Sequence, residues 1–410
     1  MSAKELQRLT VLGRVAKGAL SLVDASVLMG VSYRQARRLA KKFNENGPAG
    51  IAHGSRGRAS PKKTPLELAE KVVKLAEEKY LNYNDTHFTE IVREMEGIQL
   101  CRESVRRILR AENIGPKKKR RPPKHRSRRP RKPQEGMLVQ WDGSPHKWFG
   151  DTPCCLMLAV DDATGKAVAG HFRLHECSLG YLLLLKEVIA NHGVPCAVYH
   201  DRHSCLVRND DSWSVEEQLA GRRTPTQVGM VLENLGVRSI PAGSPQAKGR
   251  VERQFGVLQD RLAAELGTAQ IETMDDANLF LQGFFERYNR RFGKSAEEAT
   301  PAWRKAPRTL DLDATIAFRY TATVANDNTI SLGGLVINIP PGPRNRSFAK
   351  VGVEARQLVD GSWRVYFQGR IIAKHAPSPL TEPSRTLARR RTAKGAYDSS
   401  FVYLASKPGG

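Results

Sequence analysis

Residues 137–172 read MLVQWDGSPHKWFGDTPCCLMLAVDDATGKAVAGHF, and the fold class follows from their pattern. Short apolar segments at 137–141, 156–160 and 167–172 predict three strands. The last two are joined by DDATGK, which is typical of a hairpin turn. We therefore expect an antiparallel beginning to a sheet.

Helices and strands alternate after this hairpin. The apolar spacing predicts helices at 179–191, 226–235, 248–266 and 276–290, and strands at 197–200 and 237–240. Three strands followed by alternating helices and strands imply a central α/β domain, a mixed sheet with helices on its faces. We assign residues 137–300 to this domain.

The net charge of the chain favours a polyanionic partner. The 410 residues include 66 Lys and Arg against 42 Asp and Glu, which gives a net charge of +24. No basic amphipathic helix with a bulky aromatic face stands out, so nucleic acid is favoured over a membrane surface. The longest apolar run, 154–160, is far shorter than the ~20 residues of a membrane span.

Cysteine usage and the N-terminus fit a reducing cytoplasm. The six cysteines include no CxxC pair, so neither a disulfide framework nor a zinc site is expected. The first residues, MSAKELQRLT, lack the apolar core of a secretory signal.

A helix-turn-helix unit is predicted at residues 1–63. Helices at 22–30 and 33–44 flank a short turn, and Ser32 is a natural N-cap for the second helix. Polar donors near the start of this helix suit base edges and phosphates; they are Arg34, Gln35, Arg37 and Arg38. An ordinary helical hairpin with a solvated basic face is the alternative. The basic arm at 50–63 either enters a minor groove or is a plain linker.

A second all-α unit is predicted at residues 64–115, with helices at 66–79, 87–96 and 102–111. The last of these surrounds an apolar stripe with arginines and resembles a second DNA-reading helix. Its candidate DNA contacts are Arg102, Arg106 and Arg107.

Residues 116–136 are predicted to be a basic, proline-rich linker. The segment 116–133 holds eleven Lys or Arg, five Pro and no acid, a composition that disfavours a packed element. It is either a solvated linker or a linker that also lies along phosphates.

Short strands return near the C-terminal end. Strands are expected at 318–324, 329–332, 335–339, 349–358 and 363–368. Five short strands within so few residues predict a small β-barrel at 310–375. Residues 376–410 form a polar, basic tail.

Three acids occupy positions suited to metal-dependent phosphodiester chemistry. Asp142 ends the first predicted strand, Asp201 ends the fourth, and Glu252 lies in the helix that begins SPQAKGRVERQF. Two-metal chemistry needs carboxylates that converge on one point, and Mg²⁺ needs few of them. Two Asp on neighbouring strand ends and a Glu on a facing helix would form such a site.

Charged residues near these acids have other interpretations. Asp161 and Asp162 also follow a strand, but they lie in the hairpin turn, where Asp is common. Lys248 shares a helix face with Glu252 and suits a DNA phosphate; a simple helical Lys–Glu contact is the alternative. Lys248 and Arg250 are assigned to DNA binding.

The blocks QWDGS, YHDRHS and SPQAKGRVER resemble those of the DDE transposases with a retroviral-integrase-like catalytic core, nearest to the ISNCY-type bacterial insertion-sequence transposases. The resemblance extends over nearly the whole chain. It implies an RNase H-like core in which Asp142, Asp201 and Glu252 are catalytic ligands of two Mg²⁺ or Mn²⁺ ions. It also implies double-stranded DNA as partner, both terminal inverted repeats and target, and a dimer or tetramer on that DNA.

One departure from the family pattern concerns spacing. Fifty residues separate Asp201 from Glu252, which is more than is usual in that superfamily. We interpret 202–224 as an inserted loop outside the sheet that contacts either DNA or another subunit.

The leading functional hypothesis is a DNA transposase of the bacterial cytoplasm, associated with the nucleoid and not with a membrane. Water would cut the end of an insertion sequence, and the exposed 3′-hydroxyl would attack target DNA at the same site. Two alternatives remain: a DNA-binding regulator with a silent core, and a nuclease that cuts without joining. A nucleophile at Ser204 or Cys205 is disfavoured, because side chains crowded in one loop rarely reach that geometry.

Overall fold

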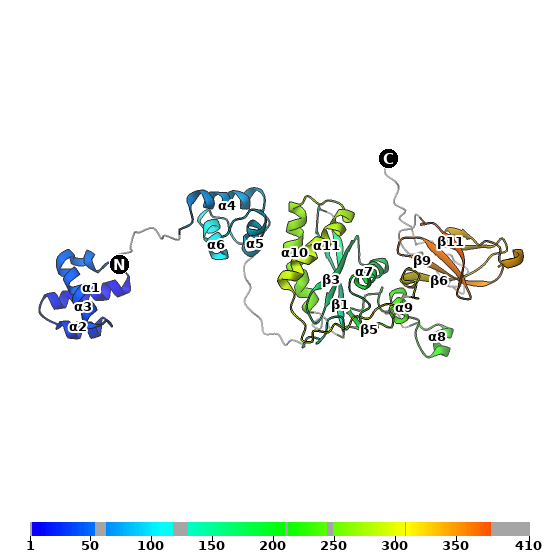
Figure 1. The fold of residues 1–410 in the computed structure, drawn as a ribbon, viewed down its shortest axis with the longest axis horizontal. Helices are drawn as coiled ribbons and strands as arrows, with labels where there is room; N and C mark the ends of the chain where they lie inside the picture. Colours follow the sequence, from blue (N-terminus) through cyan, green and yellow to red (C-terminus); the bar gives the residue numbers. More distant parts are fainter. Residues whose placement is uncertain are drawn as a thin grey trace. The chain divides into compact units, whose positions relative to one another are not determined.

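The computed structural model describes residues 2–53, 63–117, 130–151, 153–209, 212–243, 249–307 and 309–378. The chain divides into two compact units, Met1–Val72 and Val73–Gly410, and the division falls inside helix α4 (Leu66–Glu78). Figure 1 gives the labels of the helices and strands.

The first unit is a small helical domain. It contains α1 (Ala3–Ala16), α2 (Leu22–Leu28), α3 (Tyr33–Asn46) and the 3₁₀ helix η1 (Gly47–Ile51). Its core includes Leu12, Ala25, Ala36 and Ile51. The two predicted helices are present, and the Ser32 hydroxyl accepts a hydrogen bond from the Gln35 amide at 3.3 Å, as expected for an N-cap. Helix α1 was not predicted.

The second unit opens with α5 (Asp85–Met95) and α6 (Arg102–Ala111), both close to their predicted bounds. Asn84 caps α5 by accepting hydrogen bonds from the amides of Thr86 and His87. An ion pair between Arg110 and Asp85, at 2.5 Å, links α6 to the first turn of α5.

A five-stranded sheet forms the centre of this unit, in the order β3-β2-β1-β4-β5. Strands β1 (Val139–His146), β2 (Cys154–Asp161) and β3 (Ala167–Arg173) are antiparallel neighbours. Strands β4 (Ala197–His200) and β5 (Arg238–Pro241) continue the sheet in parallel with β1. The predicted mixed sheet is therefore confirmed.

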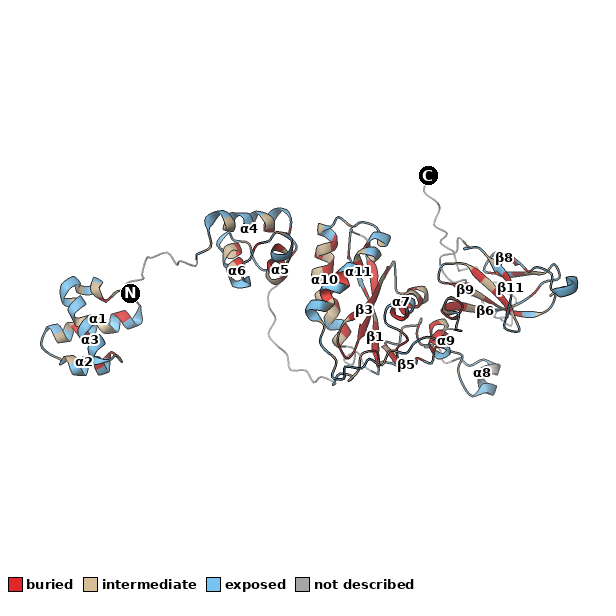
Figure 2. Ribbon diagram, in the orientation of Figure 1, coloured by how far each residue is buried: buried red, intermediate tan, exposed pale blue. Residues whose placement is uncertain are grey.

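Helices cover both faces of this sheet (Figure 1). Helices α7 (Ser178–Asn191) and α9 (Gln227–Asn234) supply one core, and α10 (Gly249–Thr268) and α11 (Met274–Phe292) supply the other. Strand β2 contributes alternate residues to the two: Met157 and Ala159 to the first, Leu156 and Leu158 to the second. Figure 2 shows the buried residues concentrated along the sheet.

The first strand is longer than predicted, and this corrects the position of Asp142. Pairing with β2 continues from Asp142, opposite Leu158, to His146, opposite Cys154, so Asp142 lies within β1 rather than at its end. The local sequence DGSP favours a turn. The fully buried β2 alongside supplies ladder hydrogen bonds that override this preference.

The inserted segment after β4 is not a plain loop. It contains the short helix α8 (Val215–Ala220), whose N-terminus is capped by Ser214 and Glu217. The Glu217 carboxylate accepts hydrogen bonds from the Ser214 and Thr224 amides at 2.9 and 2.8 Å, and it pairs with Arg208. These contacts hold the pKa of Glu217 down, to about 2.

The C-terminal part begins with α12 (Leu312–Thr315) and has six strands rather than the five predicted, with the 3₁₀ helix η3 (Pro343–Asn345) between them. The strands are β6 (Ala317–Thr323), β7 (Thr329–Leu332), β8 (Leu335–Asn338), β9 (Gly352–Leu358), β10 (Trp363–Phe367) and β11 (Arg370–His375).

These strands form two sheets, β11-β10-β9-β6 and β7-β8. A closed barrel needs two hydrogen-bonded neighbours for every strand. Within residues 309–378, β6 and β11 have one each, so the predicted barrel is not closed.

Among the helices that the structure describes, none is long and apolar enough to cross a membrane.

Candidate active site

The strand register places Asp142 and Asp201 side by side. Strands β1 and β4 are parallel, with Val139 opposite Val198 and Gln140 opposite Tyr199. Asp201 is the first residue after β4, and continuing this register by two residues sets it beside Asp142, where neighbouring strands lie about 4.8 Å apart. Both aspartates are half-buried.

Asp142 faces the α10 side of the sheet. Val139 is buried in the core beneath α7 and α9. Asp142 lies three residues further along β1, and successive residues of a strand point to opposite faces. The Asp142 carboxylate therefore projects toward the face that α10 and α11 cover.

Helix α10 lies along β1 and is held to it at two levels. Near its start, Arg250 pairs with the buried Asp162, which also accepts a hydrogen bond from Gln140 of β1 at 2.5 Å. Further along, Gln259 donates to the Ser144 hydroxyl of β1 at 3.1 Å. The nine steps from Arg250 to Gln259 rise about 13.5 Å along the helix, and the four steps from Gln140 to Ser144 rise about 13 Å along the strand. Helix and strand thus run together, and both Glu252 and Asp142 lie between the two contacts.

The third acid, Glu252, is exposed in the first turn of α10. The described residues contain no group of three or more His, Cys, Asp or Glu close enough to hold a metal ion. Lys248 belongs to 244–248, which lie outside the described residues. The structure thus places Asp201 beside Asp142 and brings α10, the helix of Glu252, alongside β1, the strand of Asp142.

The donor set fits a hard divalent cation. Asp142, Asp201 and Glu252 offer only carboxylate oxygens, the ligands that Mg²⁺ and Mn²⁺ prefer.

The chain after β4 is held by short local contacts. The His203 amide donates to the Asp201 carboxylate at 2.9 Å. The buried His200 ring bonds the Ser239 hydroxyl of β5 at 2.7 Å and the Asp201 carbonyl at 2.6 Å. The orientation of Asp201 therefore depends on its two histidine neighbours.

Glu176 is a further acid, close to the chain after β4, that the sequence pattern did not reveal. It accepts a hydrogen bond from the Tyr181 hydroxyl, and its carboxylate lies 3.8 Å from the His203 ring. A Cβ added to Gly143, next to Asp142, would come within 2.6 Å of a Glu176 oxygen. Burial holds the pKa of Tyr181 well above its usual value, and the Glu176, Asp201 and Asp142 carboxylates add to this.

Asp161 and Asp162 lie at the β2–β3 turn as expected, but both are fully buried. Asp161 accepts hydrogen bonds from the Gly136 and Thr164 amides at 2.9 and 2.8 Å. Burial raises the pKa of Asp161, and these hydrogen bonds oppose the shift. Asp162 binds Arg250, so this arginine, predicted to contact DNA, is also an internal anchor of α10.

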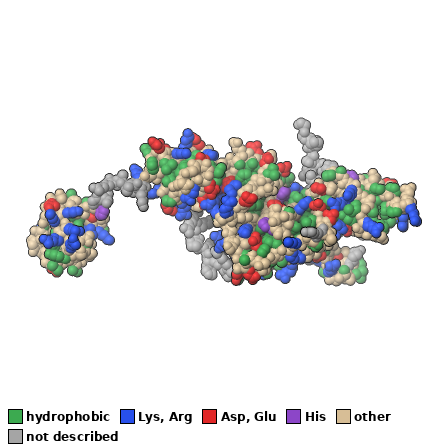
Figure 3. Space-filling view, in the orientation of Figure 1, with side chains coloured by type: hydrophobic (Ala, Val, Ile, Leu, Met, Phe, Trp, Pro, Cys, Tyr) green, Lys and Arg blue, Asp and Glu red, His purple; other side chains and the backbone are tan. Residues whose placement is uncertain are grey.

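The other candidate DNA-binding residues lie on two exposed helix faces. Arg34, Gln35, Arg37 and Arg38 are all exposed on α3. Figure 3 shows Lys and Arg side chains gathered on the N-terminal unit. On α6, Arg102, Arg106 and Arg107 are exposed, and the first two flank Glu103 at 2.9 and 3.9 Å.

Comparisons with known proteins agree with this organisation. Residues 7–59 match the model of a helix-turn-helix domain family. A protein of Sinorhizobium fredii named as a transposase, y4bF, is 37% identical over 295 residues, which is 71% of this chain. The chain spans 63% of the length of that relative.

Solved structures include two viral neighbours of low overall similarity. The HTLV-2 integrase catalytic core domain in complex with magnesium is 17% identical, with a TM-score of 0.28, over 40% of this chain and 94% of that one. The simian T-cell lymphotropic virus intasome in complex with PP2A regulatory subunit B56 gamma gives 18% identity and a TM-score of 0.31, over 77% and 99% of the two chains.

The transposase for insertion sequence IS1202 of Streptococcus pneumoniae is 32% identical over 331 residues. The alignment covers 72% of this chain and 69% of that transposase. This chain therefore belongs to the insertion-sequence transposases.

Proposed function

We propose that this protein binds the terminal inverted repeats of an insertion sequence, cuts the DNA at its ends, and joins the freed 3′-hydroxyl to target DNA. One observation carries the proposal. Asp142 lies on β1, Asp201 directly follows the neighbouring parallel strand β4, and α10, which bears Glu252, is fastened to β1 on either side of Asp142.

The carboxylates of Asp142, Asp201 and Glu252 would hold two Mg²⁺ or Mn²⁺ ions in an RNase H-like core. Such ions stabilise the attacking and leaving oxygens of an in-line displacement. The protein's own part is to concentrate negative charge on one face of the sheet and to orient it. His203 and Glu176 orient the Asp201 side, and Asp162 with Arg250 orients the Glu252 side.

DNA recognition is assigned to the helical units. In this proposal α3 reads base edges through Arg34, Gln35, Arg37 and Arg38, and α6 makes the second contact through Arg102, Arg106 and Arg107. Lys248 and Arg250 lie at the catalytic end of the DNA. Two element ends must be brought together, so a dimer or tetramer assembles on DNA, within the bacterial cytoplasm and nucleoid.

The test separates transposition from its alternatives. The purified chain is given Mg²⁺ or Mn²⁺, a plasmid carrying its gene with the genomic flanks, and separately a pre-cut end with a free 3′-hydroxyl. Cutting and joining are expected. Cutting without joining would identify a nuclease, and specific binding without either would identify a regulator.

The carboxylates are tested by isosteric substitution. Glu252→Gln, Asp142→Asn and Asp201→Asn should each lower cutting by orders of magnitude. DNA affinity should persist, because it comes mainly from cations on phosphates. Glu272→Gln is the matched control, since Glu272 is exposed and outside the site. Near wild-type cutting by Glu252→Gln would show that the assignment is wrong.

A further inference from the structure

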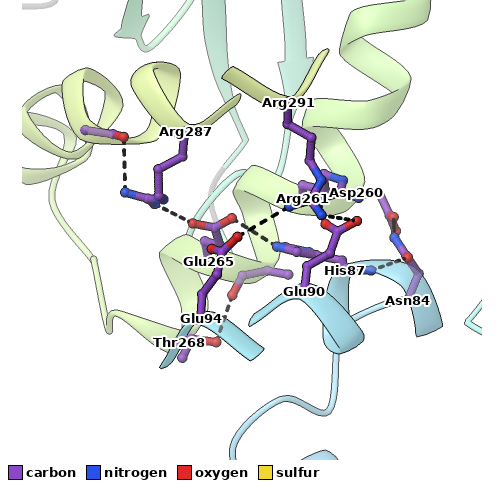
Figure 4. Close-up of polar contacts among 12 residues, drawn as sticks. Asn84, His87, Glu90, Glu94, Asp260, Arg261, Glu265, Thr268, Arg287 and Arg291 are labelled. Carbon is purple, nitrogen blue, oxygen red and sulfur yellow. Dashed lines mark hydrogen bonds and ion pairs between the residues drawn. The ribbon is translucent and has the colours of Figure 1, made fainter. Parts of the chain in front are cut away.

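A network of ion pairs joins α5 to the catalytic domain, on the face that α10 and α11 present (Figure 4). It lies within the second compact unit of the chain. We call it the α5 dock. Its members are Asn84, His87, Glu90, Asp260, Arg261, Glu265, Arg287 and Arg291.

Helix α10 supplies three residues of the α5 dock. Asp260 accepts a hydrogen bond from the Asn84 side chain. Arg261 pairs with Glu90 at 2.5 Å, and Glu265 binds the His87 ring at 3.0 Å. The three contacts fall within residues 260–265 of α10, so α5 is fixed in register against this part of the helix.

Helix α11 completes the network from the other side. Arg287 pairs with the second oxygen of Glu265 at 2.6 Å, and Arg291 pairs with the second oxygen of Glu90 at 2.8 Å. Each glutamate is therefore held by two cationic or hydrogen-bonding partners. Glu90, Glu265 and Arg261 are close to nine-tenths buried, and His87 is fully so.

The α5 dock combines charged pairs with apolar side chains. A cavity of about 330 Å³ is lined by charged residues of the α5 dock together with Ile91, Phe284, Tyr288 and Phe292. Desolvated ion pairs return little net free energy compared with apolar packing, but one misplaced or missing partner is costly. Close charge pairs also determine the register of two surfaces.

The α5 dock connects helix α6 to the part of α10 that bears Glu252. On one side, Arg110 and Asp85 tie α6, with its exposed arginines, to α5. On the other side, Glu252 lies eight residues before Asp260 on α10, about 12 Å along the helix. Helix α6, with its candidate DNA-binding arginines, is therefore connected through α5 to α10, the helix that bears Glu252.

We propose that the α5 dock determines how far from the sequence held by α6 the DNA is cut. This inference rests on the proposed transposase function. A fixed spacing between α6 and the carboxylates selects one phosphodiester at a constant distance from the bound sequence. If α5 lost its register against α10, the cutting reaction would remain possible, but it would no longer be confined to one phosphodiester.

The experiment reverses both glutamates of the α5 dock in the full chain, as Glu90→Arg with Glu265→Arg. The control, Glu233→Arg with Glu272→Arg, makes the same change in net charge at exposed positions. Cut positions are mapped at nucleotide resolution on the plasmid carrying the gene and its flanks. Joining is measured with a pre-cut end, and hydrogen exchange reports whether α5 is released.

We expect faster exchange in α5 and a share of misplaced cuts that rises at least about tenfold, because removing one partner of a buried ion pair is strongly destabilising. Joining of the pre-cut end should stay near wild type. Loss of cutting with joining retained would also support the proposal, since only the choice of phosphodiester would have failed.

Three results would overturn it: an unchanged cut position although α5 exchanges freely, unchanged exchange in α5, or loss of both cutting and joining. Glu90→Gln, which keeps shape, should give a smaller spread of cuts in the same direction. If the wild-type chain does not cut its flanks, the proposed function fails, and that result is distinct from a failure of the α5 dock.

Discussion

At the scale of single residues, the candidate site depends on buried charged side chains that join segments far apart in the sequence. Asp162 is the clearest case. It is fully buried. Its carboxylate accepts hydrogen bonds from the Gln140 side chain of β1 and from the Lys132 amide in the chain before β1, and it forms an ion pair with Arg250 of α10. One carboxylate thus fastens the strand of Asp142 to the helix of Glu252.

Asp162→Asn should therefore impair catalysis, although Asp162 is outside the set of proposed metal ligands. The change keeps the acceptor for Gln140 and removes the negative charge opposite Arg250. Residues that orient metal ligands are typically worth about 10- to 100-fold in activity. We expect a fall of that order in cutting rate, together with faster hydrogen exchange in the first turn of α10.

Asp151→Asn is the control for this change. Asp151 is fully exposed and only loosely paired with Lys147, at 3.8 Å. If both variants cut at the wild-type rate, Asp162 has no positioning role and the first turn of α10 is held by other contacts.

At the scale of elements, α7 contains the carboxyl group of Glu187, whose charged form is disfavoured by burial. Burial raises the pKa of Glu187 to about 7, from an ordinary value of 4.5, although a hydrogen bond from the Gly170 backbone opposes the shift. Between these two values the unfolded chain has released a proton that the folded chain retains. The free energy of unfolding must therefore decrease as pH rises through that window.

Glu187→Gln should remove this pH dependence. The amide keeps the acceptor for Gly170 and has no charge to bury. The variant should unfold at a higher temperature than wild type above pH 7, and the difference should vanish below pH 4.5. Thermal unfolding across this range, with the exposed Glu233→Gln as control, measures it. A constant difference at all pH values would contradict a titrating Glu187.

At the scale of the whole molecule, the proposed function divides the excess of positive charge between general and specific DNA contacts. Phosphate contacts supply salt-dependent affinity for any sequence, whereas base-edge contacts discriminate. Arg34 and Arg37 are exposed at the start of α3, in the segment that matches a helix-turn-helix family. In the proposed function these two arginines discriminate between sequences.

Arg37→Ala should relax specificity more than it lowers general affinity. A bidentate arginine contact to guanine is worth about 1–3 kcal/mol of discrimination. Binding isotherms at several salt concentrations, on the element end and on a scrambled duplex, give both quantities. Lys4→Ala, an exposed change on α1, is the control. An equal loss on both duplexes would reduce Arg37 to a phosphate contact.

Local sequence patterns determined much of this protein. Helix α6 and strand β4 have the bounds predicted from periodicity and turn residues, and Ser32 caps α3 as expected. The mixed sheet followed from the order of strands and helices, and Asp142 and Asp201 were singled out because each accompanies a strand. Caps, periodicity and strand order depend on residues close in sequence, so they can be read directly.

Only the tertiary structure decided how the site and the α5 dock are assembled. Strand β1 continues past Asp142 because β2 lies beside it, and the predicted barrel does not close because β6 and β11 are edges. Asp162 with Arg250, and His87 with Glu265, are far apart in sequence. A charged residue has the same appearance in a sequence whether its partner is water or a distant side chain. Folding alone brings the partners together and removes the water between them.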